Sequence, residues 1–231
     1  MIHGDEIKRV VREHYAGSLQ TGCCGAGSSC CGTEPAGDLA IAGPALGCGT
    51  PLGYAELQPG ETVVDLGSGA GREVLMAARE VGPTGHAIGI DMTPEMVSTA
   101  RGNARRNSLS NAEFRLGEIE QLPIATGSVD VVISNCVINL VPDKARAFTE
   151  AYRVLKPGGR LVVSDMVTHG AMSETVRSDL TAWAGCVAGA VDVQEYAAVM
   201  ERAGFRDTDI LARTDAPPGH VFSITIRARK P

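Results

Sequence analysis

The sequence predicts an α/β fold, doubly wound around a mostly parallel seven-stranded sheet, with a helical insert and a Cys-rich N-terminal segment. From Glu61 onward, short runs rich in Val and Ile alternate with helical patterns, which is typical of parallel strands joined by crossover helices. A glycine-rich turn follows the first of these runs, at 67–71. The length of 231 residues, of which 44% are hydrophobic, suits one α/β domain with small additions.

The first 56 residues differ in composition from the remainder of the chain. Charged and apolar residues alternate at helical spacing near the N-terminus, which predicts an amphipathic helix to about Tyr15. The segment 17–53 is rich in Gly, Ala, Ser, Cys and Pro and has few large apolar side chains. Because such a segment buries little surface, we expect a loop unless a ligand ties it down. Residues 1–56 are therefore predicted to be a helix followed by a Cys-rich segment.

Residues 57–169 are predicted to form the core of the sheet. Thr93 is expected to cap one helix, with Pro94 at its first position, because these residue types favour helix starts. Helices are also expected at 70–81 and 143–155, and the run KPGG at 156–159 should turn the chain into the next strand. The five strands are expected at 62–66, 86–90, 112–116, 129–134 and 160–164.

Residues 170–231 are predicted to complete the sheet. An insert of helical character is expected at 172–191, and a further helix at 193–203. Two final strands, 208–213 and 221–227, flank a turn that contains Pro and Gly. We expect these strands to form an antiparallel hairpin at one edge of the sheet.

The charge distribution disfavours two classes of partner. The net charge is −6 and the Lys and Arg residues are scattered, whereas nucleic acids and anionic membranes require a concentrated basic face. No apolar run approaches the roughly 20 residues that span a bilayer, and the N-terminus lacks the apolar stretch of a signal peptide. We therefore expect a cytoplasmic protein without a nucleic-acid or membrane partner.

The glycine turn and the strand that follows it predict a cofactor site. In open α/β sheets, ligands bind at the carboxyl ends of the strands, where glycines allow a sharp turn and a close approach. Asp91 ends the second predicted strand, where its carboxylate can accept hydrogen bonds from a ribose; capping of the following helix is its alternative role. The dinucleotide pattern G-x-G-x-x-G needs glycine where this chain has Arg72, which disfavours a dinucleotide oxidoreductase.

The seven cysteines are the second chemical signal. An odd number without a secretion signal argues against a disulfide framework and favours free thiols, metal ligands or redox groups. Cys136 follows the fourth predicted strand and should face the same cleft as the glycine turn; soft thiolates suit soft metals and metalloids. Simple packing is the alternative role for Cys136 and for Cys186. Cys23-Cys24 and Cys30-Cys31 are spaced more widely than usual zinc ligands, so a zinc site and a thiol-rich loop are both open.

Three motifs resemble those of the class I S-adenosylmethionine-dependent methyltransferases, namely VDLGSGAG at 64–71, GIDM at 89–92 and LKPGGRL at 155–161. The resemblance implies a Rossmann-like fold with S-adenosylmethionine as its cofactor. It also implies that the glycine turn cradles the amino-acid end, that the end of the second strand holds ribose and adenine, and that the loop after the third strand borders the adenine. The cofactor-binding residues predicted here are Asp65, Gly67, Ser68, Gly69, Asp91, Met92, Gly117, Glu118, Ile119 and Asn135.

Four further runs resemble motifs of the arsenite methyltransferases, and this resemblance covers nearly the whole chain. They are SNCVINLVPDK at 134–144, WAGCVAGA at 183–190, LGCGTP at 46–51 and SSCCG at 28–32. The resemblance implies that Cys136 and Cys186 are arsenic ligands and that Cys48 is the third ligand or a redox partner. It further implies that Cys30 or Cys31 takes part in thiol exchange, with thioredoxin or glutathione as the external reductant.

The resulting hypothesis is an S-adenosylmethionine-dependent enzyme that methylates arsenite, or thiol-bound trivalent arsenic, for detoxification. Three thiolates can replace the three hydroxyls of arsenite and leave a lone pair on arsenic, so methyl transfer needs no protein base. One alternative is a methyltransferase of an organic small molecule with structural cysteines. The other is a non-catalytic metalloid-binding thiol protein.

Overall fold

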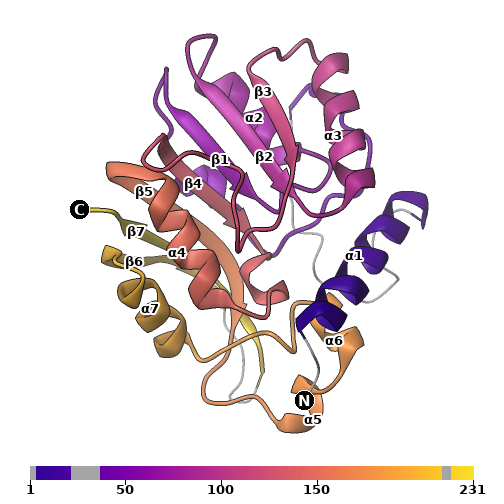
Figure 1. Ribbon diagram of the computed structural model, residues 1–231, viewed down its shortest axis with the longest axis vertical. Coiled ribbons are helices and arrows are strands. Elements are labelled where there is room, and N and C mark those ends of the chain that lie inside the picture. The colour runs from indigo at the N-terminus through magenta and orange to yellow at the C-terminus, as the bar shows by residue number, and fades with distance from the viewer. Residues whose placement is uncertain (1–3, 22–36, 215–219) are drawn as a thin grey trace.

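The computed structural model describes residues 4–21, 37–214 and 220–231. They form a seven-stranded sheet in the order β3-β2-β1-β4-β5-β7-β6, as Figure 1 shows. Only β7 runs antiparallel to its neighbours, which confirms the predicted doubly wound, mostly parallel sheet with a reversed strand near one edge. The strands are β1 (Thr62–Leu66), β2 (His86–Asp91), β3 (Ala112–Leu116), β4 (Val129–Asn135), β5 (Leu155–Val167), β6 (Arg206–Arg213) and β7 (Phe222–Arg229).

Helices cover both faces of the sheet, with α2 and α3 on one face and α4 and α7 on the other (Figure 1). None of the described helices is long and apolar enough to cross a membrane. The helices are α1 (Gly4–Thr21), α2 (Arg72–Glu80), α3 (Pro94–Arg106), α4 (Lys144–Val154), α5 (Glu174–Arg177), α6 (Leu180–Ala184) and α7 (Val193–Arg202), with the 3-10 turns η1 (Pro51–Tyr54) and η2 (Ile138–Leu140).

Each face of the sheet has its own apolar core. On the face of α4 and α7, Phe148 and Tyr196 are fully buried and their rings meet edge to face with centroids 5.4 Å apart. On the other face, Leu75 of α2 is fully buried and Val97 of α3 nearly so. Burial of one such side chain stabilises the fold by about 1.5–3 kcal/mol. The two cores therefore hold the strand ends as a rigid platform for the loops that follow them.

β5 begins earlier than predicted, because the KPGG run at 156–159 lies within the strand and does not form a separate turn. The backbone N–H of Gly158 donates to the carbonyl of Lys230 (2.8 Å), and the N–H of Lys230 donates to the carbonyl of Gly159 (2.9 Å). Pairing with the distant C-terminal segment thus overrides the local turn preference of Pro and Gly.

One helical prediction needs correction, and the predicted helical insert is divided into two short helices. α1 continues past Tyr15 to Thr21, although Gly17 and Ser18 are poor helix formers, because Tyr15 donates to the carbonyl of Ala184 and Ser18 is buried. The insert at 172–191 contains only the single turns α5 and α6. The Asp179 side chain accepts from the N–H groups at 181 and 182 and so starts a new helix there.

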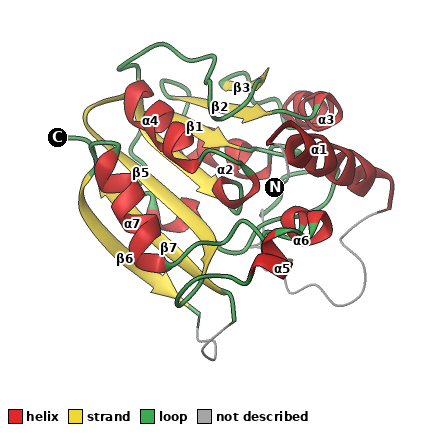
Figure 2. Cartoon of the chain, turned by 60° about the horizontal axis from the view of Figure 1, so that its bottom comes forward, coloured by secondary structure: helices red, strands yellow, loops and turns green. Residues whose placement is uncertain are grey.

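The fold places three segments around the carboxyl ends of the central strands. Ile7 and Val11 of α1 pack in a small apolar cluster with Trp183 of α6 and with the chain that leaves β4. Figure 2 shows α1 and α6 side by side at this end of the sheet. The N-terminal helix and the late insert therefore cover the strand ends where a ligand would bind.

Candidate active site

The glycine turn after β1 forms the floor of a pocket. Gly67 and Gly71 have φ angles of +72° and +88°, a left-handed conformation that glycine adopts without strain. A Cβ atom on Gly71 would lie 2.6 Å from the ring of Phe114. The N–H groups of Gly67 and Ser68 both donate to the carbonyl of Ile90 (2.7 and 3.0 Å), so β2 fixes the turn in place.

Asp91 occupies the end of β2 in the manner of a turn-forming residue. Its two carboxylate oxygens accept from the N–H groups of Thr93 (2.8 Å) and Gly69 (2.9 Å). Burial raises the pKa of Asp91, and these hydrogen bonds oppose the increase. A carboxylate has about four acceptor sites, so two remain for ligand hydroxyls. The geometry therefore accommodates both roles considered for Asp91, which are ribose binding and capping of the helix that follows.

The pocket is bounded by every residue predicted to bind the cofactor. It also reaches Cys136 and three side chains of α1 that the sequence analysis did not identify, namely Lys8, Val11 and Tyr15. The amphipathic pattern of α1 was visible in the sequence, but the face that it covers was not. The predicted residues that bound the pocket are Asp65, Gly67, Ser68, Gly69, Asp91, Met92, Gly117, Glu118, Ile119 and Asn135.

The chemistry of this lining fits S-adenosylmethionine. Asp65 is buried at the end of β1, and burial, reinforced by the nearby charges of Glu73 and Asp91, raises its pKa well above the ordinary value. This concentration of carboxylates suits a ligand that carries an amino group and a positively charged sulfur. The Ser68 hydroxyl is buried with no hydrogen-bond partner among the described residues. Ile119, which is buried, offers an apolar surface to a base.

Three thiols converge beside this pocket. Cys136 and Cys186 are buried and Cys48 is half-buried, and all three are free thiols. The Cys186 thiol donates to the carbonyl of Cys136 (3.2 Å). Hydrogen bonds with Cys186 and Cys48, together with burial, raise the pKa of the Cys136 thiol well above its ordinary value. For Cys48, the hydrogen bond with Cys136 lowers the pKa, but burial and the nearby charges of Asp165 and Cys186 together outweigh it and raise the pKa.

Cys136 and Cys186 share an unusual backbone conformation. Both have a φ angle of +61°, the left-handed region that residues other than glycine seldom adopt. The N–H of Cys136 donates to the carbonyl of Ser164 (2.7 Å), which holds the strained turn against β5. Such strain is concentrated at functional sites, because the surrounding structure must hold it in place.

Two polar side chains hold Cys48 against the sheet. The Cys48 N–H donates to Asn135 Oδ1 (3.0 Å), and Asn135 Nδ2 donates to the carbonyl of Gly49 (2.8 Å) and to Glu73 (2.6 Å). The Ser223 hydroxyl donates to the carbonyl of Cys48 (2.7 Å). Asn135 thus bounds the cofactor pocket and also fixes the loop of the neighbouring thiol.

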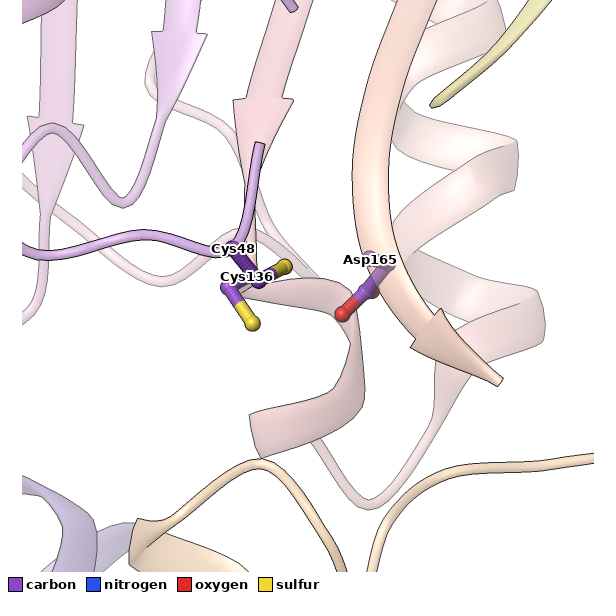
Figure 3. Close-up of side chains that lie close together, drawn as sticks. All are labelled: Cys48, Cys136 and Asp165. Carbon is purple, nitrogen blue, oxygen red and sulfur yellow. The ribbon is translucent and has the colours of Figure 1, made fainter. Parts of the chain in front are cut away.

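Asp165 is a further site residue that the sequence analysis missed. Figure 3 shows its carboxylate directed toward Cys48 and Cys136, and the two sulfurs and one carboxylate oxygen all lie within 4.8 Å of one another. Burial raises the pKa of Asp165 to about 7. The signal that identified Asp91, an acidic residue near the carboxyl end of a strand, was present here too.

Cys30 and Cys31 lie outside the described residues, as do Cys23 and Cys24.

The comparisons with known proteins agree with this geometry. Residues 57–204 match the family model of a methyltransferase domain. The chain is 44% identical to an arsenite methyltransferase of Halobacterium salinarum, over 98% of this chain and 67% of the relative, and 41% identical to the human arsenite methyltransferase, over 62% and 40% respectively. Its fold matches the crystal structure of an arsenic(III) S-adenosylmethionine methyltransferase from Chlamydomonas reinhardtii with a TM-score of 0.66 at 31% identity, covering 94% and 72% of the two chains.

The strand order, the glycine turn and the family match define a class I S-adenosylmethionine-dependent methyltransferase. The chain spans about two thirds of the Halobacterium relative and less than half of the human one. Within its class, it belongs to the arsenite methyltransferase family.

Proposed function

We propose that this chain transfers a methyl group from S-adenosylmethionine to trivalent arsenic held by Cys48, Cys136 and Cys186. The observation that supports this most directly is that Cys136 bounds the cofactor pocket and also contacts both other thiols. S-adenosylmethionine, when bound, supplies an electrophilic methyl group on a positively charged sulfur. The acceptor is thereby held next to the donor, and proximity and alignment supply most of the rate.

Arsenite capture is compatible with the raised pKa values of the Cys48 and Cys136 thiols. As each thiol sulfur bonds to arsenic, its proton leaves with one hydroxyl as water, so three thiols and one arsenite give bound arsenic and three waters. No net proton is released, and the thiols need not be ionised beforehand. Arsenic keeps its lone pair, which is the nucleophile, so the reaction requires no general base.

Methylation raises arsenic formally from the trivalent to the pentavalent state. A thiol that attacks one of the arsenic-bound sulfurs forms a disulfide and returns two electrons to arsenic, which restores the trivalent state. We propose that Cys30 or Cys31 takes part in this exchange and that thioredoxin or glutathione reduces the resulting disulfide. The physiological role proposed for the reaction is arsenic detoxification.

Product analysis tests the proposal. Purified protein is incubated with S-adenosylmethionine, a thiol reductant and arsenite, and arsenic species are separated by chromatography and detected by elemental mass spectrometry. We expect methylated arsenic from the parent protein and none from Cys136→Ser or Cys186→Ser. Binding of S-adenosylmethionine without methylated arsenic would favour an organic substrate, and binding of arsenite alone would favour a non-catalytic thiol protein.

A further inference from the structure

Asp165 is a buried carboxylate without a positively charged hydrogen-bond partner. It accepts from the N–H of Met166 (3.0 Å), the N–H of Asn139 (3.1 Å) and the hydroxyl of Tyr196 (3.0 Å). Within the described part of the chain, no cation lies within ion-pair distance of it, and Lys144 acts on it only at longer range. Buried charges are normally paired in direct contact, so a carboxylate with no adjacent cation at this point calls for a functional explanation.

The three donors fix the orientation of this group and oppose part of the pKa increase that burial causes. They direct hydrogen bonds to the carboxylate oxygens, an arrangement that favours the ionised form. One oxygen lies within 4.8 Å of the sulfurs of Cys48 and Cys136 (Figure 3). Arsenic bound by these sulfurs would therefore lie close to a fixed negative charge.

The transfer reaction creates positive charge on arsenic. The lone pair of the neutral thiolate-bound arsenic forms a bond to the methyl carbon, while the electron pair of the broken carbon–sulfur bond stays on the departing sulfur. One positive charge thus moves from that sulfur to arsenic, and no external oxidant or reductant is consumed. A negative charge beside arsenic, and not beside the methyl donor, lowers the barrier to this step.

The position of Asp165 meets this condition. Cys136 bounds the cofactor pocket, whereas Asp165 does not. The carboxylate therefore lies on the acceptor side of the thiols and acts on arsenic more strongly than on the cofactor. Trivalent arsenic with three thiolate ligands needs no fourth ligand, so capture of arsenite does not depend on this carboxylate.

We propose that Asp165 is a catalytic residue that stabilises the positive charge developing on arsenic during methyl transfer. This inference rests on the proposed function. It assigns Asp165 to the chemical step and not to arsenite binding, so removing its charge should change the rate constant for transfer and leave the affinity for arsenite unchanged.

The test separates arsenite binding from methyl transfer in Asp165→Asn, at about pH 8, above the pKa of Asp165. Trp183, the only tryptophan of the chain, packs in the cluster that contains Cys136 and Cys186, so its fluorescence reports arsenite binding. We expect the dissociation constant for arsenite to stay within about 3-fold. We expect the single-turnover rate of arsenic methylation to fall by about 10- to 100-fold.

Two variants distinguish charge from structure. Tyr196→Phe removes one hydrogen bond and keeps the carboxylate, so its rate should fall by less than about 3-fold. Asp165→Glu keeps the charge and should restore part of the rate lost in Asp165→Asn. Any one of three results would overturn the inference. The methylation rate of Asp165→Asn could equal that of the parent, or Tyr196→Phe could lose as much of the rate as Asp165→Asn does. The arsenite affinity of Asp165→Asn could also fall by as much as its rate. If the parent protein produces no methylated arsenic, the proposed function itself fails.

Discussion

Asp165 is buried and Lys144 is half-buried, and the pKa values of these two side chains move toward each other. Burial raises the pKa of Asp165 to about 7, and burial lowers the pKa of Lys144 to about 8. Each group partly offsets the cost of burying the other, because their opposite charges attract across the interior. The pH dependence of folding should report this arrangement.

The free energy of unfolding is predicted to fall as pH rises from about 5 to about 7, and Asp165→Asn should flatten this decline. Since the pKa of Asp165 rises from 3.8 to about 7 on folding, the folded state binds the extra proton. The stabilisation is up to about 4 kcal/mol at low pH and is lost as pH rises through about 7, and about 2 kcal/mol of this loss falls between about pH 5 and about pH 7. Urea unfolding of both proteins at several pH values measures it.

Asp192→Asn serves as the matched control for this prediction. Hydrogen bonds from the N–H groups of Gly170 and Gln194 lower the pKa of Asp192, so its contribution to stability is lost only below the pH range of the experiment. The slope of this variant between about pH 5 and about pH 7 should equal that of the parent. Equal slopes in Asp165→Asn and the parent would contradict the assignment of the effect to Asp165.

At the scale of elements, α1 is tied to the rim of the cofactor pocket by one lysine. Lys8 Nζ lies 2.6 Å from Glu118 and 2.7 Å from Glu120 in the loop after β3. Val11 and Tyr15, further along the same helix, bound the pocket. The ion pairs of Lys8 therefore hold α1, which forms one wall of the pocket, against the loop after β3.

Lys8→Met is predicted to weaken cofactor binding by about 3- to 10-fold while changing the free energy of unfolding by less than about 1 kcal/mol. Exposed and half-buried ion pairs contribute little to folding, but loss of this contact lets α1 move away from the pocket. Calorimetric titration with S-adenosylmethionine measures the affinity. Arg9→Met, which removes only the exposed pair with Glu13, should bind like the parent; equal weakening in both variants would contradict the role of Lys8.

The elements that the sequence predicted well are those with local causes. Strands β1 and β3 have the predicted bounds, and α3 begins at Pro94 after Thr93 as predicted, although the Thr93 side chain makes no capping hydrogen bond. The extension of α1 and the early start of β5 depend on partners far away in the chain, at Ala184 and Lys230. No local pattern contains those contacts, so residue-by-residue propensities could not find them.

The candidate site also contains residues that local sequence rules found and residues whose placement depends on distant parts of the chain. The strand-end rule placed Asp91 at the pocket, and the motif resemblance placed Asp65 and Asn135 there. The same rule applied to β5 would have selected Asp165. The convergence of Cys48 and Cys186 on Cys136 was different, because it depends on how the N-terminal loop and the insert fold over the sheet. Motif resemblance, and not spacing, indicated that convergence.

On the scale of the whole molecule, the three thiols join parts of the chain that are far apart in sequence. Cys48 belongs to the segment before the sheet, Cys136 follows β4, and Cys186 lies in the insert after β5. Asn135 accepts from the N–H of Cys48 and the Ser223 hydroxyl donates to its carbonyl, and these two bonds fix the first of these segments. Three bonds to one arsenic atom would add a cross-link between all three segments in the folded state.

Arsenite alone, without S-adenosylmethionine, is therefore predicted to stabilise the protein against heat. A ligand that binds only the folded state at 100 times its dissociation constant adds about 2.7 kcal/mol, which for a chain of this size corresponds to an increase in Tm of about 5–10 °C. Thermal unfolding with and without arsenite measures this shift.

In the single variants Cys48→Ser, Cys136→Ser and Cys186→Ser, the increase in Tm caused by arsenite should shrink to less than half, because two thiols hold arsenic more weakly than three. The stabilisation by S-adenosylmethionine should persist in Cys48→Ser and Cys186→Ser, because neither of these side chains bounds the cofactor pocket. A full arsenite shift in Cys186→Ser would show that only two thiols bind arsenic and that the insert has another role.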